Sequence, residues 1–258
     1  MKKTNSSQRV AILTMGCRVN QFETDLILKM GSDHGHDTTC SLDKAGIIII
    51  NTCSVTRESE RQARKLIRKL GRDYPDARLV VTGCYAQRSP ETFANQPNVD
   101  LVLGNGDKKN LWNFWNRHRQ NHPSTDPFPI SMEEGGSIAV HGPILDHSEN
   151  RARASLQIQD GCDRKCTYCL IPQVRGPGVS MEARRILQQA ASYLDSGSRE
   201  LVLLGIDIGA YGRDLSPVLS LSAILNMLIP LCQNARLRLS SIDPMDLNDE
   251  LLELFAPG

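Results

Sequence analysis

Long apolar runs and aromatic side chains are both scarce in this sequence. Phe, Trp and Tyr make up only 5% of its 258 residues, and the longest apolar run, 46–50, is no longer than a strand. A helix needs about 18 consecutive apolar residues to span a membrane, so the sequence predicts no such helix. Residues 1–10 lack the apolar stretch of a secretory signal, and we therefore expect a cytoplasmic protein.

An excess of charge of either sign is also missing. The 30 basic and 29 acidic residues leave a net charge of +1, which excludes a globally basic nucleic-acid binder but allows a local basic patch. Apolar residues make up 40% of the chain, which is enough to build a core and excludes wholesale disorder. The length suits one large domain or two ordinary ones.

Cysteine is the most informative residue type in the chain. Without a secretory signal, eight cysteines favour metal-binding or catalytic roles over a disulfide framework. Cys40 and Cys232 have no patterned neighbours and are expected to be small buried hydrophobic residues. The other six form two groups, which we name the N-terminal trio (Cys17, Cys53 and Cys84) and the loop trio (Cys162, Cys166 and Cys169).

Strand and helix patterns alternate along the N-terminal part of the chain. The apolar runs predict helices between four strands, which lie at 9–15, 46–52, 78–82 and 99–103. Such alternation predicts an α/β fold, here a doubly wound, flavodoxin-like parallel sheet with helices on both faces. We expect this domain to span 8–117 and a linker to follow over 118–150, where the periodicity disappears.

Two helix starts can be predicted from capping residues. Asn20 is followed by a glutamate three positions later, which is an N-cap signature, and Gly31 or Gly35 should end the helix that it opens. Thr56 is the expected N-cap of the next helix, which should end at Gly71.

The N-terminal trio has a regular place in this pattern. Cys17, Cys53 and Cys84 each follow the end of a predicted strand by one or two residues. Ligands of open parallel sheets bind beyond the carboxyl ends of the strands, so we expect the three thiols to face one crevice. Structural zinc takes four protein ligands, whereas three thiolates suit an iron–sulfur cluster with one iron left open to an outside ligand.

The second predicted helix carries a row of arginines. Arg57, Arg61, Arg64, Arg68 and Arg72 recur at steps of three and four residues and so share one face, opposite the apolar face that packs on the sheet. A solvated charged face explains such a row, and so does a surface that contacts RNA phosphates. We take Arg57, Arg61, Arg64 and Arg68 as candidate RNA-binding residues.

A second strand–helix series begins at Ala154, and its strands are expected at 154–159, 200–205 and 236–241. Directly after the first of them comes Cys162-Asp-Arg-Lys-Cys166-Thr-Tyr-Cys169. The spacing lets three thiolates of one loop fold around one metal centre, again without a fourth cysteine nearby.

This loop resembles the radical S-adenosylmethionine (SAM) signature, and the chain as a whole resembles the methylthiotransferase family. The resemblance covers about residues 9 to 255 and keeps the order of the family's motifs. The matching segments are Gly16-Cys-Arg-Val-Asn20, Asn51-Thr-Cys-Ser54, Thr82-Gly-Cys-Tyr85, Asp160-Gly-Cys162, Leu204-Gly-Ile-Asp-Ile208 with Tyr211-Gly212, and Arg238-Leu-Ser-Ser-Ile-Asp-Pro244.

The resemblance implies two [4Fe–4S] clusters and SAM as cofactors. The loop trio would bind the cluster that cleaves SAM, and the radical formed would abstract a hydrogen from carbon 2 of the substrate base. The N-terminal trio would hold an auxiliary cluster whose open iron carries the sulfur to be transferred. Tyr168 would lie near the adenine of SAM, and Arg175 and Asp207 would contact SAM or a cluster, although surface loop positions explain these two equally well.

Gly16-Cys-Arg-Val-Asn20, followed by Gln21-Phe-Glu23, is similar to the tRNA threonylcarbamoyladenosine methylthiotransferases. This resemblance implies methylthiolation of carbon 2 of threonylcarbamoyladenosine at position 37 of tRNA, by a monomer that has an electron donor of the flavodoxin or ferredoxin type and a sulfur donor. The alternatives are another target (isopentenyladenosine tRNA or a ribosomal protein) and a non-enzymatic cluster or zinc scaffold.

The sequence departs from the family in the number of strand–helix units of its second domain. Family members close a partial barrel of about six such units, whereas this sequence has three. We therefore expect 151–258 to form a truncated radical-SAM partial (β/α) barrel. We also expect 1–258 alone to bind SAM and tRNA weakly, and an inactive truncated fragment is the further alternative.

Overall fold

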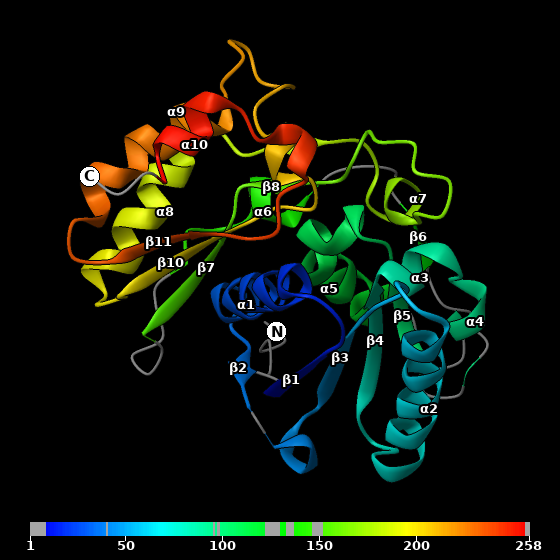
Figure 1. Cartoon of the computed structure of the whole chain (residues 1–258). Coiled ribbons are helices and arrows are strands. Elements are labelled where there is room, and N and C mark those ends of the chain that lie inside the picture. Colours follow the sequence, from blue (N-terminus) through cyan, green and yellow to red (C-terminus); the bar gives the residue numbers. More distant parts are fainter. Residues whose placement is uncertain are drawn as a thin grey trace. The chain divides into compact units, whose positions relative to one another are not determined.

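The computed structural model describes residues 9–39, 41–94, 96, 99–121, 130–132, 137–145 and 152–255, so Cys40 lies outside the described residues. The chain divides into two compact units, 1–138 and 139–258, each with its own parallel sheet and helices (Figure 1). A search of the described part finds no helix with the length and apolar character needed to cross a membrane.

The first unit is built on a six-stranded sheet in which every neighbouring pair is parallel. The spatial order is β2-β1-β3-β4-β5-β6. The first five strands of this order follow the flavodoxin arrangement, so the predicted flavodoxin-like sheet is confirmed. The strands are β1 (Arg9–Thr14), β2 (Asp37–Thr38), β3 (Ile47–Thr52), β4 (Arg78–Gly83), β5 (Val99–Leu103) and β6 (Ile130–Ser131).

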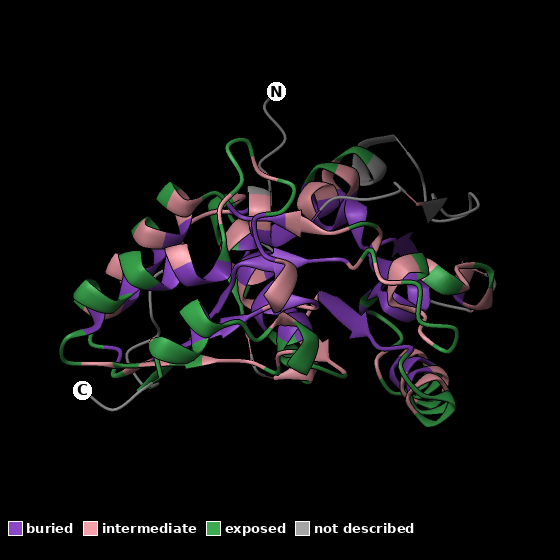
Figure 2. Ribbon diagram, turned by 45° about the horizontal axis from the view of Figure 1, so that its top comes forward, coloured by how far each residue is buried: buried purple, intermediate pink, exposed green. Residues whose placement is uncertain are grey.

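Helices cover both faces of this sheet because its central strands are apolar on both sides. Ile48 and Ile50 of β3 belong to a core cluster with Ala63 and Ile67 of α2. Ile47 and Ile49 point to the other face, and all four isoleucines are fully buried. Helices α1 and α5 cover that other face (Figure 1), and the strands at the centre of the sheet are coloured as buried in Figure 2. The helices of the unit are α1 (Arg18–Asp33), η1 (Leu42–Lys44), α2 (Arg57–Asp73), α3 (Cys84–Arg88), α4 (Glu91–Ala94), η2 (Gly106–Asn110) and α5 (Leu111–Asn121).

The structure corrects two of the predicted helix boundaries. The N-cap of α1 is Cys17, whereas Asn20 lies inside the helix and is buried. Of the two glycines predicted to end α1, Gly35 is confirmed: the helix ends at Asp33 with His34 as its C-cap, and Gly35 follows with a φ of +81°. Gly31 lies inside the helix, at the position where Trp112 packs on it: a Cβ there would lie 2.6 Å from Cζ2 of the indole. Thr56 is confirmed as the N-cap of α2, since its hydroxyl accepts a hydrogen bond from Ser59 N (3.1 Å).

The helix end predicted at Gly71 is wrong by two residues, since α2 continues to Asp73. The predicted linker, 118–150, contains the end of α5, which runs to Asn121, as well as β6 on the outside of β5 and α6 (Ile138–His141). Residues 122–129, 133–136 and 146–150 lie outside the described residues.

The second unit contains the three predicted strand–helix units. Its sheet has the order β11-β10-β7 with parallel pairing throughout, and a short antiparallel pair, β8 with β9, follows β7. The strands are β7 (Arg153–Gln157), β8 (Gln159–Asp160), β9 (Val179–Ser180), β10 (Glu200–Leu204) and β11 (Arg236–Leu239). The helices are α7 (Ile171–Arg175), α8 (Ala183–Asp195), η3 (Ile208–Ala210), α9 (Leu221–Leu228), η4 (Ile229–Cys232), η5 (Pro244–Asp246) and α10 (Asp249–Glu253).

Candidate metal centres

The N-terminal trio follows the carboxyl ends of three neighbouring strands. Cys17 caps α1 after β1, Cys53 comes directly after β3, and Cys84 opens α3 after β4. Strand order changes direction between β1 and β3, and this is the point at which ligands of open α/β sheets bind. The sheet therefore places the three turns side by side at its ligand-binding edge.

Glycines let these turns approach closely. Gly16 has a φ of +92°, and a Cβ there would lie 2.6 Å from the Cys53 Sγ. Gly83 has a φ of +99°, and a Cβ there would collide with the Thr52 backbone. Both positions favour glycine because other residues rarely adopt this backbone region.

Asparagine side chains join the turns and reach the sulfur atoms. The Asn20 amide donates to Met15 O (2.8 Å) and to Thr52 O (3.1 Å), so it links the turn after β1 to the end of β3. The Asn105 amide donates to the Cys84 Sγ at 3.6 Å. Hydrogen bonds to ligand sulfurs are one means by which a protein tunes an iron–sulfur cluster.

A buried ion pair lies in the same unit. Lys108, in η2 after β5, pairs with Glu23 of α1, and both side chains are almost fully buried. Two charges without access to water are stable only as partners, so the pair fixes α1 relative to η2. No local pattern indicates this pair, because its members are 85 positions apart and are ordinary residue types.

The loop trio lies in an irregular segment between β8 and α7. The start of the segment is tightly held: Gly161 has a φ of +67°, and Cys162 N donates to Gly176 O (3.1 Å). Exposure increases along the loop, since Cys162 and Cys169 are half-buried whereas Cys166 is exposed. A cavity of about 210 Å³ adjoins Cys162 and is lined by residues such as Gln159, Asp207 and Arg213. The first cysteine of the loop therefore lies beside a small hollow lined mostly by polar side chains.

One carboxylate and one guanidinium lie beside Cys162. Its Sγ lies 3.5 Å from Asp207 Oδ2, and Arg164 pairs with the same carboxylate through two nitrogens, at 2.7 and 3.1 Å. Burial raises the pKa of the Cys162 thiol, and the nearby Asp207 carboxylate raises it further. A hydrogen bond from the Arg164 backbone lowers this pKa, but the net direction is upward. Sequence reasoning missed Arg164, although its place between two cysteines of the trio was a visible signal.

The other two candidate cofactor contacts differ in exposure. Tyr168 is 88% exposed, so its ring is free to meet a ligand. Arg175 ends α7 and is buried, with its Nη1 at 2.9 and 3.1 Å from the two carboxylate oxygens of Asp160. Arg175 is thus part of the packing beneath the loop, and the surface-loop interpretation does not apply to it.

All six cysteines of the two trios are free thiols. Cys232 is also a free thiol, and it is buried as expected. Among the described residues, no three His, Cys, Asp or Glu side chains are arranged around a point where one metal ion would fit. A cluster requires a different arrangement, because each thiolate binds its own iron at a separate corner. Three thiols on turns that follow neighbouring strands, with Gly16 leaving room against the Cys53 sulfur, fit such a group.

The arginine row lies on the outer face of α2 as predicted, but its members differ. Arg61 is paired with Glu58 through two hydrogen bonds of 2.8 Å, which lower the pKa of Glu58 to about 2. Arg64 donates to the Tyr85 hydroxyl and lies over its ring. Arg57 and Arg68 are exposed, and no carboxylate of the described residues pairs with them.

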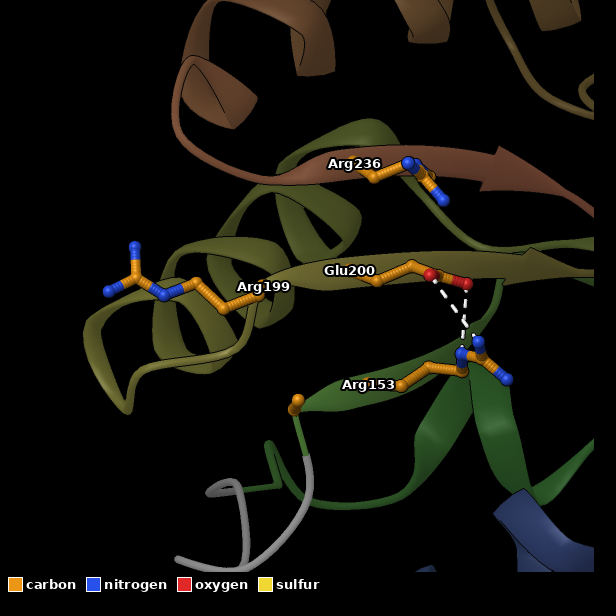
Figure 3. A pocket seen from close by; sticks show the side chains of 5 residues that line it. Arg153, Arg199, Glu200 and Arg236 are labelled. Atoms are coloured by element: carbon orange, nitrogen blue, oxygen red, sulfur yellow. Dashed lines mark hydrogen bonds and ion pairs between the residues drawn. The ribbon is translucent and has the colours of Figure 1, made fainter.

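A second basic surface lies at the amino ends of β7, β10 and β11. It surrounds a hollow of about 740 Å³ lined by Ala152, Arg153, Arg199, Glu200 and Arg236, in which Glu200 pairs with Arg153 at 2.9 Å (Figure 3). The loop trio follows the opposite ends of these strands, so this hollow is not part of the candidate centre.

Comparisons with known proteins match both units. Residues 9–104 match the family described as "Uncharacterized protein family UPF0004", and residues 156–258 match the radical SAM superfamily. A solved structure of TsrM, a radical SAM methyltransferase from Kitasatospora setae, superposes with a TM-score of 0.65 at 14% identity and covers 96% of this chain and 57% of its own. At that identity the likeness shows the fold alone.

Curated relatives match nearly the whole chain. Threonylcarbamoyladenosine tRNA methylthiotransferase MtaB of Rickettsia prowazekii is 36% identical over 249 residues, which are 96% of this chain and 55% of the relative. The enzyme of the same name from Bacillus subtilis is 33% identical over 95% of this chain and 54% of its own. Ribosomal protein uS12 methylthiotransferase RimO of Trichlorobacter lovleyi is 31% identical over 97% of this chain and 56% of the relative. The chain spans about half the length of these relatives.

Proposed function

Because this chain belongs to the methylthiotransferase family of radical SAM enzymes, we propose that it takes part in the methylthiolation of carbon 2 of threonylcarbamoyladenosine in tRNA. The observation that carries the proposal is the presence of two separate groups of three free thiols, one in each unit. The N-terminal trio follows the carboxyl ends of three parallel strands, and the loop trio follows β7 and β8. The names of the two relatives with the highest identity given above support tRNA as the substrate.

The chain's residues would divide the cofactors between the two units. The N-terminal trio would hold an auxiliary [4Fe–4S] cluster, and the loop trio would hold the cluster that binds SAM. When bound, these groups supply reductive cleavage of SAM and a site for the sulfur to be transferred. The protein would position them: Asn20 and Asn105 order the first site, and the ion pairs of Asp207 and Arg175 order the second.

Tyr168 and Asp207 remain our candidates for contact with SAM. The exposed Tyr168 ring can stack on an adenine, and Asp207 lines the cavity beside Cys162. Arg175 is fully engaged beneath the loop, so we propose that it acts by holding Asp160, the residue two positions before Cys162.

The exposed arginines of α2 are proposed to contact tRNA phosphates. In the double variant Arg57→Gln with Arg68→Gln, tRNA affinity at low salt should fall several-fold. The slope of log affinity against log salt should decrease by about 1 to 2, because about one counterion is released per phosphate contact. Arg61→Gln is the comparator on the same face, and its effect should be smaller since Glu58 already holds that guanidinium. Filter binding across a salt series checks this, and an unchanged slope in the double variant would contradict it.

A ribosomal protein is the second candidate substrate, because the RimO relative is 31% identical to this chain. Nucleoside analysis separates the two. Deleting the gene should remove the methylthio form of threonylcarbamoyladenosine from bulk tRNA and leave uS12 unchanged. Returning the intact gene should restore the methylthio nucleoside. Persistence of the modified nucleoside after deletion would reject the tRNA proposal.

We further propose a cytoplasmic monomer that receives electrons from a flavodoxin or ferredoxin type of donor and sulfur from a separate donor.

Iron and sulfide analysis after anaerobic reconstitution tests the cofactors. Two clusters require about eight of each per chain and one cluster about four. A colourless zinc protein, or bound iron that never supports SAM cleavage, would favour the scaffold alternative.

A further inference from the structure

One guanidinium connects the loop trio to the ends of two strands. Arg164, two positions after Cys162, contacts three carboxylates that come from elsewhere in the second unit. Asp207 follows β10, while Asp243 and Asp246 follow β11. The contacts are 2.7 and 3.1 Å to Asp207, 3.2 Å to Asp243, and a short ion pair with Asp246.

Two of these acids need a cation because they are removed from water. The side chain of Asp246 is 5% exposed and that of Asp207 is 9% exposed. Arg213 also pairs with Asp246, at 3.0 Å, but its side chain is 66% exposed. Among the described residues, Arg164 is the cation that pairs with both Asp207 and Asp246. A buried carboxylate without a paired cation is strongly destabilising. Arg164 therefore holds the two strand-end segments and the cysteine loop in one arrangement.

Close packing at a glycine supports the same arrangement. A Cβ at Gly209, in η3, would collide with the side chain of Asp246, so the segments after β10 and β11 meet at this glycine. Arg164 N also donates to the Cys162 Sγ at 3.4 Å, and Asp207 Oδ2 lies 3.5 Å from that sulfur. The sulfur, the guanidinium and the carboxylate thus form one connected group.

We propose that Arg164 is a positioning residue. By pairing with Asp207, Asp243 and Asp246 it fixes the first half of the cysteine loop before any cluster binds, and it balances the carboxylate charge that lies beside the Cys162 sulfur. The inference rests on the proposed function only for the role of Cys162 as a cluster ligand. The predicted ordering of the loop is a property of the iron-free chain.

Hydrogen–deuterium exchange of the reduced, iron-free protein tests this ordering. In Arg164→Ala, amides of 161–170 should exchange about tenfold faster than in the unaltered chain, because loss of the ion pairs lets the loop open more often. Lys165→Ala is the matched control: this neighbouring cation is exposed, and its removal should leave exchange within about twofold. Arg164→Lys should give an intermediate rate, since an ammonium cannot reproduce the planar two-point contact with Asp207.

Cluster loading gives a second measurement. In the Cys53→Ala background, the iron that remains bound reports the loop trio. Adding Arg164→Ala should lower this iron content by about half or more, whereas adding Lys165→Ala should leave it unchanged. Equal loop exchange in the unaltered, Arg164→Ala and Lys165→Ala proteins would overturn the proposal. If the unaltered chain took up no iron, the proposed function would fail, whereas the exchange experiment would still decide the role of Arg164.

Discussion

Replacement of Cys53 by alanine should remove about half of the bound iron and sulfide, from about eight of each per chain to about four. Cys53 follows β3 at the centre of the three adjacent turns, and its sulfur lies against Gly16 in the turn after β1. No other cysteine of the described residues belongs to this unit apart from Cys17 and Cys84. Two remaining thiolates hold a [4Fe–4S] cluster poorly, so loss of the auxiliary centre is the expected result.

The two activities should separate in this variant. Reductive cleavage of SAM should persist because the loop trio is unchanged, whereas methylthio transfer to tRNA should fall below detection. Anaerobic iron and sulfide counts, 5′-deoxyadenosine formation and nucleoside analysis measure the three quantities. Cys232→Ala is the control, since it removes a buried thiol outside both trios and should leave all three unchanged. Full iron content with normal transfer in Cys53→Ala would reject the assignment of the N-terminal trio.

Replacement of Lys108 by methionine should destabilise the first unit by about 3–5 kcal/mol, because the Glu23 carboxylate would remain buried without this cation. The chain's two tryptophans, Trp112 and Trp115, are both buried in this unit. Denaturant unfolding followed by tryptophan fluorescence therefore reports the stability of the first unit without a contribution from the second.

Two further variants separate the buried pair from a general charge effect. Lys29→Met breaks the exposed pair with Asp33 on the same helix, α1, and should change stability by less than about 1 kcal/mol. Adding Glu23→Gln to Lys108→Met should recover part of the loss because no uncompensated charge remains. A Lys108→Met effect as small as that of Lys29→Met would show that the pair is not important for stability.

Much of the fold was predictable from local patterns. The isoleucine run 47–50 could only be a strand buried on both faces, and Thr56 was a correct N-cap. The elements that local patterns missed include the short edge strands β2 and β6, because two residues carry no periodicity. Asn20 was misread as a cap since its amide satisfies the backbone of other segments rather than that of its own helix.

The sequence by itself determined the chemistry of the candidate site: six cysteines, their two spacings and their positions after strands are all local features, set by residue type and strand period. The tertiary structure decided which other side chains serve those cysteines. Arg164 meets Asp246 across 82 positions and Lys108 meets Glu23 across 85. Such pairs depend on how strands are ordered in a sheet, and sheet order arises from packing between segments that no local pattern records.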